Sequence, residues 1–420
     1  MKIISEIKTQ FLGLNSDQKK SLTRICLTLF SLFFSYPLIR ATSTALFLEV
    51  FKAKSTPQVW VYSVITLSFA IVIFNKFQVK HSVHKLYATV SILSFVLFVL
   101  FNHFVVQGFE YWVYPLFVWK EVYIVLCVHM ALGYMNSILD YETAKIIYGP
   151  LGAIGSIGSI LGGQVTSLLT KSFVFFSDVG NLASINLMGA LLVLISAFIF
   201  FEQKEFVLKE DKAKHKKDSP LKSIYEVRYY VCGIATLVIL TQFCINLANF
   251  KFNVEFEKFV FGEVEKASYL GRLYSIISTV SLLIQIFVIP ILFKLVKNSR
   301  IHFIIPVIYM SFFVFSLIGG SNGLLPVAAM FVLYKGFDYS IFSAAKEMLY
   351  FPLDAKQKYG AKYIVDMVVY RFSKGLISFI LIFVQSIVFV ESLLAICLIL
   401  WLLILIPLFN LQSKLIADDK

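Results

Sequence analysis

Long apolar runs, separated by short polar linkers, dominate the sequence. Each run is about 20 residues long and apolar on every side, as expected of a helix that crosses a hydrocarbon core. The alternation of apolar and polar positions that strand barrels require does not occur in these runs. The pattern predicts an all-α membrane protein with twelve transmembrane helices, near residues 24–50, 57–75, 86–106, 112–135, 146–170, 180–201, 228–250, 268–293, 301–319, 324–345, 361–386 and 388–410.

Composition supports the membrane assignment. Hydrophobic residues make up 59% of the chain and charged residues only 15%, whereas soluble domains hold roughly 45–50% apolar residues. A large soluble core is the alternative, but soluble helices keep a polar face and these runs do not.

The charged linkers assign the two sides of the membrane. Lys and Arg gather in the linkers 75–85 and 294–300 and in the hydrophilic segment 202–228, while the loops 107–112 and 319–323 carry neither. Because basic linkers stay in the cytoplasm, twelve spans place both termini there as well. The net charge of +13 therefore reflects topology, with some attraction to anionic lipid, and no nucleic-acid polymer is expected as a partner.

A short repeat relates the two parts of the chain. The segments "ETAKIIYGPLG" (142–152) and "SAAKEMLYFPLDAKQKYG" (343–360) both hold Ala-Lys, a Tyr and Pro-Leu. They follow the fourth and the tenth predicted helix. There we expect Tyr148-Gly149-Pro150 and Tyr350-Phe351-Pro352 to interrupt the connection to the next helix. The repeat predicts two six-helix halves of the major facilitator type, 1–201 and 228–420, joined by a basic cytoplasmic linker at 202–227.

Ionisable residues within the apolar runs are the candidate functional groups, because a charge near the bilayer midplane needs a cavity or a partner. Lys335 and Asp338, three apart, should share a helix face, whereas the adjacent Lys120 and Glu121 should point in different directions. Cations slightly outnumber acids, which favours an anionic substrate; structural salt bridges are the alternative. The deep candidates are Arg40, Glu49, Lys120, Glu121, Lys335, Asp338, Asp366, Arg371 and Lys374.

Proline and glycine add two expectations about the helices. Pro37 removes a helical hydrogen bond three residues before Arg40, which suits a discontinuous binding helix. Gly158 and Gly162 form a GxxxG pattern, which indicates close packing against a neighbouring helix and not a phosphate-binding loop.

Metal, cofactor and enzyme chemistry are not expected. The five cysteines and six histidines are scattered, and no pattern of metal ligands or catalytic groups appears. No cleavable signal or transit peptide is visible either, which favours a bacterial inner membrane.

The segment 337–375 resembles the most characteristic part of the ATP/ADP translocases of intracellular bacteria and plastids. The shared residues there are Lys346, Glu347, Met348, Tyr350, Pro352, Leu353, Asp366, Arg371 and Lys374. The segments 136–152, 244–260 and 34–40 are similar to the region after the family's fourth helix, to its seventh helix and to its first helix. The resemblance implies a nucleotide exchanger.

The chain departs from the family at three charged positions. The resemblance places Ser43-Thr44, Ser137 and Asn249 where the family has charged residues, and keeps Lys346. These differences favour a changed substrate, since Arg40, Lys346, Arg371 and Lys374 remain.

The function expected is therefore a secondary transporter that exchanges a nucleotide or a related phosphorylated anion by alternating access. The alternative is another substrate on the same fold, such as another metabolite or an amphipathic lipid. We expect a monomer in the lipid bilayer, with Lys346 reaching a substrate phosphate or an acid of the other half, Glu142 or Asp140. The substrate-binding candidates are Arg40, Asn249, Lys346, Arg371 and Lys374, and the gating or coupling candidates are Lys145, Glu142, Glu347, Asp338, Lys335, Asp366 and Glu121.

Overall fold

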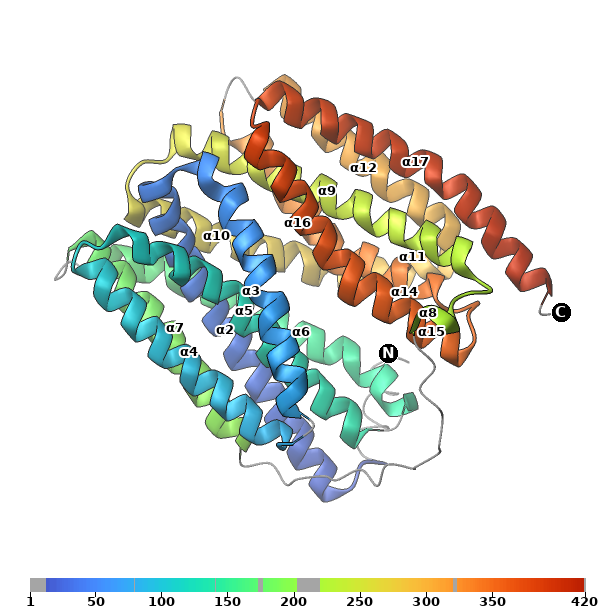
Figure 1. The fold of residues 1–420 in the computed structure, drawn as a ribbon, viewed down its shortest axis with the longest axis horizontal. Coiled ribbons are helices and arrows are strands. Elements are labelled where there is room, and N and C mark those ends of the chain that lie inside the picture. The colour runs from blue at the N-terminus through green and yellow to red at the C-terminus, as the bar shows by residue number, and fades with distance from the viewer. Residues whose placement is uncertain are drawn as a thin grey trace. The chain divides into compact units, whose positions relative to one another are not determined.

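The predicted helices are present in a computed structural model, which describes residues 13–78, 80–139, 141–172, 177–201, 220–319 and 323–418 (Figure 1). Within these residues, eleven helices are long and apolar enough to cross a membrane. The helical runs agree with the sequence prediction to within a few residues at most ends. The first, the seventh and the twelfth are the main exceptions, because α2 begins at Ser16, α9 continues to Phe259 and α17 continues to Asp418.

The chain forms two compact units. Unit 1 comprises residues 1–52, 65–212 and 260–279, and unit 2 comprises residues 53–64, 213–259 and 280–420. The division into halves at 201 and 228 remains a prediction, since short pieces of the α3 and α10 helices are assigned to the opposite unit.

In unit 1, α2 is the central helix and packs against α5, α6 and α7. The α4 helix lies alongside α5 and α7, as Figure 1 shows. Polar residues of α2 contribute to this packing, because Asn186 of α7 donates to the hydroxyls of Thr42 and Ser43, both at 3.0 Å. The elements of unit 1 are α2 (Ser16–Phe51), most of α3 (Thr56–Gln78), α4 (Val83–Val106), η2 (Glu110–Trp112), α5 (Val113–Ile138), α6 (Tyr141–Ser172), α7 (Asp178–Phe201) and most of α10 (Glu263–Leu283).

In unit 2, α9 is the central helix and packs against α13, α16 and α17, while α12 packs against α13 and α17. The core is rich in aromatic rings: Tyr309 and Tyr334 stack at 3.9 Å, and each phenol donates to the other residue's carbonyl. The elements are η1 (Ala53–Ser55), the start of α3, α8 (Pro220–Ser223), α9 (Arg228–Phe259), η3 (Ile284–Val288), α11 (Ile289–Leu295), α12 (Asn298–Gly319), α13 (Leu325–Phe337), η5 (Asp338–Phe342), α14 (Ser343–Leu349), α15 (Ala355–Lys362), η6 (Tyr363–Val369), α16 (Tyr370–Phe383) and α17 (Ile387–Asp418).

Three elements of unit 2 are π-helical turns inside longer helices. They are η3, η5 and η6, and the last two contain Asp338 and Asp366. The eleventh predicted span, 361–386, corresponds to the helical run α15–η6–α16, over 355–383. It is long enough to cross a bilayer but carries Asp366, Arg371 and Lys374. A π-turn inserts an extra residue into a helix, and such turns are frequent at functional sites.

Two expected helix breaks are wrong. Pro37 lies inside the continuous helix α2, and Pro150 lies inside α6. A proline removes one helical hydrogen bond, and transmembrane helices tolerate this because neighbouring helices and local adjustments satisfy the freed backbone group. The break before α6 instead follows Leu139, the C-cap of α5. The second expected break is confirmed, because α14 ends at Leu349 and a turn follows at Tyr350.

Gly158 and Gly162 lie where α6 crosses α2, as the GxxxG pattern predicts. A Cβ atom on Gly158 would come within 2.7 Å of the Phe30 carbonyl oxygen, and one on Gly162 would overlap the Phe34 carbonyl. Only glycine permits this approach of the two backbones.

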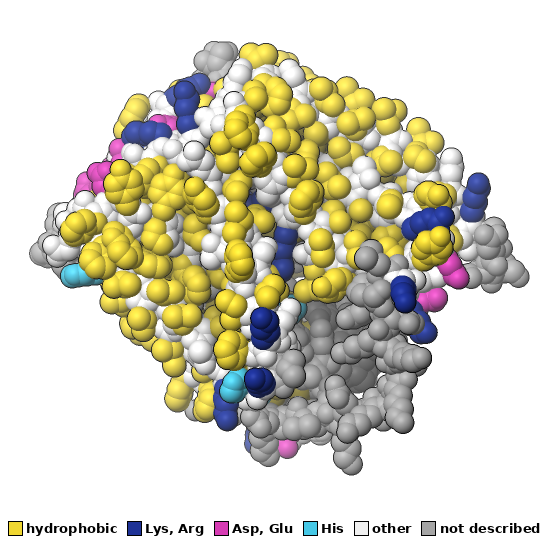
Figure 2. Space-filling model, in the orientation of Figure 1, with side chains coloured by type: hydrophobic (Ala, Val, Ile, Leu, Met, Phe, Trp, Pro, Cys, Tyr) yellow, Lys and Arg dark blue, Asp and Glu magenta, His cyan; other side chains and the backbone are white. Residues whose placement is uncertain are grey.

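The outer surface of the helices is apolar. Figure 2 shows hydrophobic side chains over most of the face drawn, with charged groups mostly near its margins. Large side chains such as Phe69, Phe198 and Phe383 are more than 60% exposed. Their surroundings must therefore be hydrocarbon, which agrees with a protein that crosses the membrane several times.

Candidate functional site

Arg40 in unit 1 lies against two tyrosine rings. Its guanidinium carbon is 4.1 Å from the ring centre of Tyr274 and 5.5 Å from that of Tyr36. Tyr36 precedes Arg40 by one helical turn on α2, and Tyr274 comes from α10. A guanidinium over an aromatic face keeps its charge and its edge donors, so this arrangement can present Arg40 to an anion.

Lys120 and Glu121 form an ion pair, so the prediction that they point in different directions is wrong. Lys120 Nζ lies 2.9 Å from Glu121 Oε1 and 3.3 Å from the ring centre of Phe117. Neighbouring residues on a helix point about 100° apart, but the Lys and Glu side chains are long enough to meet. Glu49, another deep candidate, pairs with Lys266 of α10.

Lys346 and Asp366 form the centre of the candidate site in unit 2. Lys346 Nζ lies 2.5 Å from Asp366 Oδ1, and the Tyr350 hydroxyl lies 3.2 Å from the same oxygen. Burial raises the pKa of the Tyr350 phenol, and the carboxylates of Asp366 and Glu347 raise it further. The phenol therefore keeps its proton and donates to Asp366.

Further charges surround this pair. Glu347 binds Lys362 at 2.5 Å, and both are exposed to water. Asp338 is buried, with 6% of its surface exposed. Its carboxylate lies close enough to Lys335 and Lys346 to be attracted by both positive charges. Lys335 also lies 5.3 Å from the ring centre of Tyr339. The structure thus brings five predicted site residues into one neighbourhood of unit 2, Lys335, Asp338, Lys346, Glu347 and Asp366, and adds Tyr350, which was not predicted as a site residue.

Lys346 has an internal partner that the sequence did not predict, because its ammonium is held by Asp366 of its own unit. The expected contact with a substrate phosphate or with an acid of the other half stays a prediction. Asp140 and the side chains of Glu142 and Lys145 lie outside the described residues, although the backbone of the latter two belongs to α6.

Arg371 and Lys374 lie one turn apart on α16, and both are half-buried. Among the described residues, no hydrogen bond or ion pair holds the Arg371 guanidinium. A half-buried cation of this kind can accept an external anion. Asn249, the remaining predicted substrate-binding residue, is half-buried on α9.

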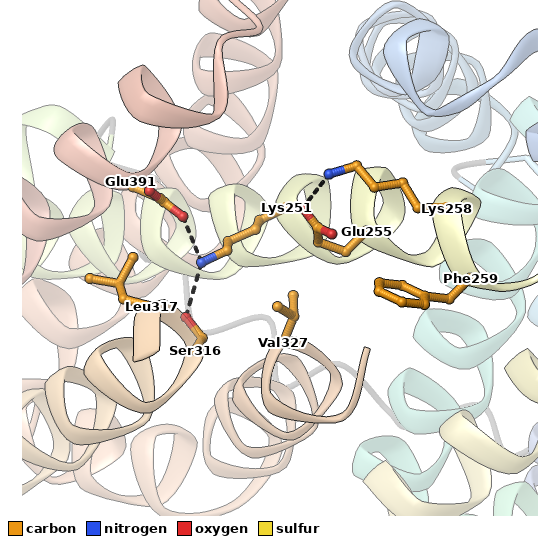
Figure 3. A pocket seen from close by; sticks show the side chains of 8 residues that line it. All are labelled: Lys251, Glu255, Lys258, Phe259, Ser316, Leu317, Val327 and Glu391. Carbon is orange, nitrogen blue, oxygen red and sulfur yellow. Dashed lines mark hydrogen bonds and ion pairs between the residues drawn. The ribbon is translucent and has the colours of Figure 1, made fainter. Parts of the chain in front are cut away.

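A second charged pocket in unit 2 was missed by sequence reasoning. Figure 3 shows Lys251 of α9 reaching between Glu391 of α17 and Ser316 of α12. Its ammonium lies 2.8 Å from Glu391 Oε1 and 3.1 Å from the Ser316 hydroxyl. The cavity measures about 350 Å³ and is also lined by the ion pair Glu255–Lys258. The charges of its two lysines and two glutamates therefore cancel.

Lys251 was overlooked because the seventh helix was predicted to end at residue 250. The segment that follows, "KFNVEFEKF", is polar but still helical. A lysine four residues before a glutamate is a helical signal that could have extended the prediction. Because Lys251 joins α9 to α12 and α17, the pocket can clamp three helices.

Two of the residues that replace charges of the family are serines whose hydroxyls form hydrogen bonds within their own helix. The Ser43 hydroxyl donates to the Ile39 carbonyl at 2.5 Å, and the Ser137 hydroxyl donates to the Tyr134 carbonyl at 2.6 Å. Neither supplies a charge to a ligand. Among the described residues, no group of three or more potential metal-ligating side chains comes together.

Residues 103–414 match the model of the family described as TLC ATP/ADP transporter. The chain belongs to this family. ADP,ATP carrier protein 3 of Rickettsia conorii is 26% identical over 334 residues, which cover 69% of this chain and 65% of that protein. ADP,ATP carrier protein 1 of Chlamydia pneumoniae is 23% identical over 283 residues, covering 59% and 55%. The chain thus spans less than two thirds of the length of these relatives.

Solved transporter structures share the fold of this TLC family member. A bacterial homologue of the human lysosomal transporter Spinster superposes with a TM-score of 0.63 at 11% identity, covering 97% of this chain and 99% of that one. The nucleoside transporter NupG gives 0.61 at 15% identity, covering 95% and 99%. The xylose transporter XylE from E. coli gives 0.61 at 11% identity, covering 92% and 98%. The all-helical fold of the major facilitator type is therefore confirmed.

Proposed function

We propose that the chain is a secondary transporter that exchanges a nucleotide or a related phosphorylated anion across a membrane by alternating access. Membership of the TLC ATP/ADP transporter family supports the class of substrate. The observation that carries the proposal is Arg371, a half-buried guanidinium with no hydrogen bond or ion pair among the described residues. An anionic ligand would supply its missing partner.

The site chemistry supports the same substrate class. Arg40 offers a planar cation backed by the Tyr274 ring, and guanidinium groups bind phosphate oxygens in a bidentate manner. Lys346 carries a compact charge on a flexible side chain, and its ammonium is bound to the Asp366 carboxylate. A substrate phosphate could replace Asp366 at this ammonium, which would couple substrate binding to the release of an internal ion pair.

The roles of the remaining charged residues follow from this scheme. Arg40, Asn249, Lys346, Arg371 and Lys374 would contact substrate in one or another state. The gating or coupling residues would be Lys335, Asp338, Glu347, Asp366, Glu121, Glu142 and Lys145. The protein would act as a carrier and not as an enzyme, and it would work as a monomer. It would lie in a bacterial inner membrane with both termini in the cytoplasm.

A different substrate on the same fold is the second candidate. Ser43 and Ser137, which stand where the family has charges, form local hydrogen bonds to backbone carbonyls, and Asn249 carries no charge. A transporter with fewer fixed charges would favour a less highly charged ligand, such as another metabolite or an amphipathic lipid.

Uptake into reconstituted vesicles tests the proposal. Vesicles loaded with unlabelled ADP would be offered labelled ATP, ADP, nucleoside monophosphates and nucleosides in turn. We expect uptake of at least one phosphorylated compound, dependent on an internal counter-substrate and lost in Arg371→Gln. Uptake of nucleosides alone would favour the second candidate. No uptake of any member above protein-free vesicles would overturn the nucleotide assignment.

A further inference from the structure

A charged pocket lies on unit 1 where α6 and α10 meet, apart from the residues assigned to transport. It measures about 250 Å³, and its polar lining consists of Lys171, Glu265, Ser268, Tyr269 and Arg272. Lys171 is the penultimate residue of α6, and Arg272 is the tenth residue of α10. Because a helix rises 1.5 Å per residue, Arg272 lies about 14 Å from the start of its helix, within the depth of a bilayer.

The backbone around the pocket is held closely. A Cβ atom on Gly271 would come within 2.8 Å of the Gly163 carbonyl oxygen, so the two helices touch at their glycines. One helical turn further, the hydroxyls of Ser167 and Ser268 lie 2.9 Å apart. Ser167 also accepts a hydrogen bond from Arg272 Nε at 2.8 Å. This bond orients the guanidinium and leaves its terminal N–H groups available.

The surface beside the pocket is apolar and exposed. On α6, Leu161 is 44% exposed and Leu168 is 65% exposed, and on α10 Ile276 is 49% exposed. Leu168 precedes Lys171 by three residues, and Ile276 follows Arg272 by four, so each pair shares one helix face. Exposed leucine and isoleucine at these positions indicate contact with lipid chains, and Arg272 is exposed on the same surface.

The two cations have no ion-pair partner within the described part of the chain. The single polar contact of Arg272 there is the hydroxyl of Ser167, and Lys171 makes no ion pair. A charged group at this depth requires a counter-ion or a route to the interface. Glu265 lies at the same pocket but forms no salt bridge with either cation, so the net charge of the pocket is +1.

We propose that this pocket binds the phosphate of an anionic phospholipid headgroup, with Arg272 and Lys171 on the phosphate oxygens. Arg and Lys side chains form strong charge-assisted hydrogen bonds to phosphate oxygens, and Tyr269 supplies an aromatic ring of the kind that lies at the membrane interface. Because Glu265 limits the net charge to +1, a singly charged phosphodiester fits better than doubly charged inorganic phosphate.

Native mass spectrometry of the whole protein tests the site. Protein extracted from vesicles of phosphatidylglycerol and phosphatidylcholine in equal amounts should retain one phosphatidylglycerol. Each of Arg272→Gln and Lys171→Gln should weaken retention about fivefold, equivalent to about 1 kcal/mol per basic residue near the membrane surface. Arg272→Lys should restore most of it. The control Lys294→Gln removes an exposed cation from unit 2 and should change nothing.

Three results would overturn the proposal. Equal retention of phosphatidylcholine would mean that no anion is recognised. Displacement of the bound lipid by millimolar inorganic phosphate would identify free phosphate as the ligand. Unchanged retention in both Gln variants would show that neither cation binds the lipid. If Arg272→Gln does not fold, Lys171→Gln at the end of α6 provides the same comparison.

Discussion

Lys346 and Asp366 lie 20 residues apart, and their charged atoms meet at 2.5 Å across the turn that joins α14 to α15. The pair is mostly shielded from water, with the lysine side chain 14% exposed and the aspartate 27% exposed. Tyr350 donates to the same carboxylate oxygen. The Lys346 ammonium, which we propose to bind the substrate, is therefore bound to an internal carboxylate.

If Asp366 competes with substrate for Lys346, the two variants should change KM in opposite directions. Asp366→Asn should lower KM several-fold, because the ammonium is released, and Lys346→Gln should raise it. Uptake kinetics in reconstituted vesicles measure both. Lys362→Gln, which removes a water-exposed pair, is the matched control and should leave KM within about twofold. Parallel changes in both variants would show that the pair acts as a structural unit.

The aromatic support of Arg40 should contribute to affinity. Arg40→Ala should abolish uptake while expression and thermal unfolding stay close to wild type. Arg40→Lys keeps the charge but loses the planar stacking on Tyr274, worth about 0.5–2 kcal/mol, so KM should rise roughly fivefold. Tyr274→Phe preserves the ring face and serves as control, whereas Tyr274→Leu should resemble Arg40→Lys. Normal uptake by Arg40→Ala would make Arg40 a packing residue.

The Lys251–Glu391 pair should stabilise the fold more than it serves transport. Lys251→Met leaves a carboxylate behind and should lower the free energy of unfolding by about 2–3 kcal/mol, less than for a fully buried pair since Glu391 is 26% exposed. Removing both charges, in Lys251→Met with Glu391→Leu, should restore most of the loss. Thermal unfolding in detergent measures each variant. A double variant as unstable as the single one would argue against the clamp.

Topology can be tested by labelling with a membrane-impermeant maleimide in a background without the five native cysteines. Single cysteines at Lys80 and Lys297 should react from the cytoplasmic side, because basic linkers stay there. A cysteine at Gly108, in a loop without Lys or Arg, should react only from outside. Labelling of Lys80 and Lys297 from opposite faces contradicts the twelve-span arrangement.

The helices could be predicted from sequence because apolarity and length are local properties. Even the charged run α15–η6–α16 was found, since Tyr350-Phe351-Pro352 indicates the preceding turn. The charge pairs could not be predicted in the same way. The partner of Lys346 depends on how a turn folds back, and the partner of Lys251 lies 140 residues away on α17.

Regular helical spacing does not hold where the helix itself is irregular. A helix with 3.6 residues per turn would align Asp366, Tyr370 and Lys374 on one face, but Asp366 belongs to the π-turn η6. Lys335 and Asp338, which are expected to share a face, lie on either side of the start of the π-turn η5, and their shared face stays a prediction. No residue type in either segment indicates a π-turn, so the directions of these side chains had to come from the structure.

The π-turns η5 and η6 have a mechanical consequence. Each stores one residue more than an α-helical turn would hold, and converting η6 to α-helical geometry would rotate the helix beyond it by about 100° and shift it by about 1.5 Å. Such a conversion would turn Asp366 away from Lys346 while α14 stays in place. The helix could thus exchange an internal anion for an external one by a local change of winding, without bending.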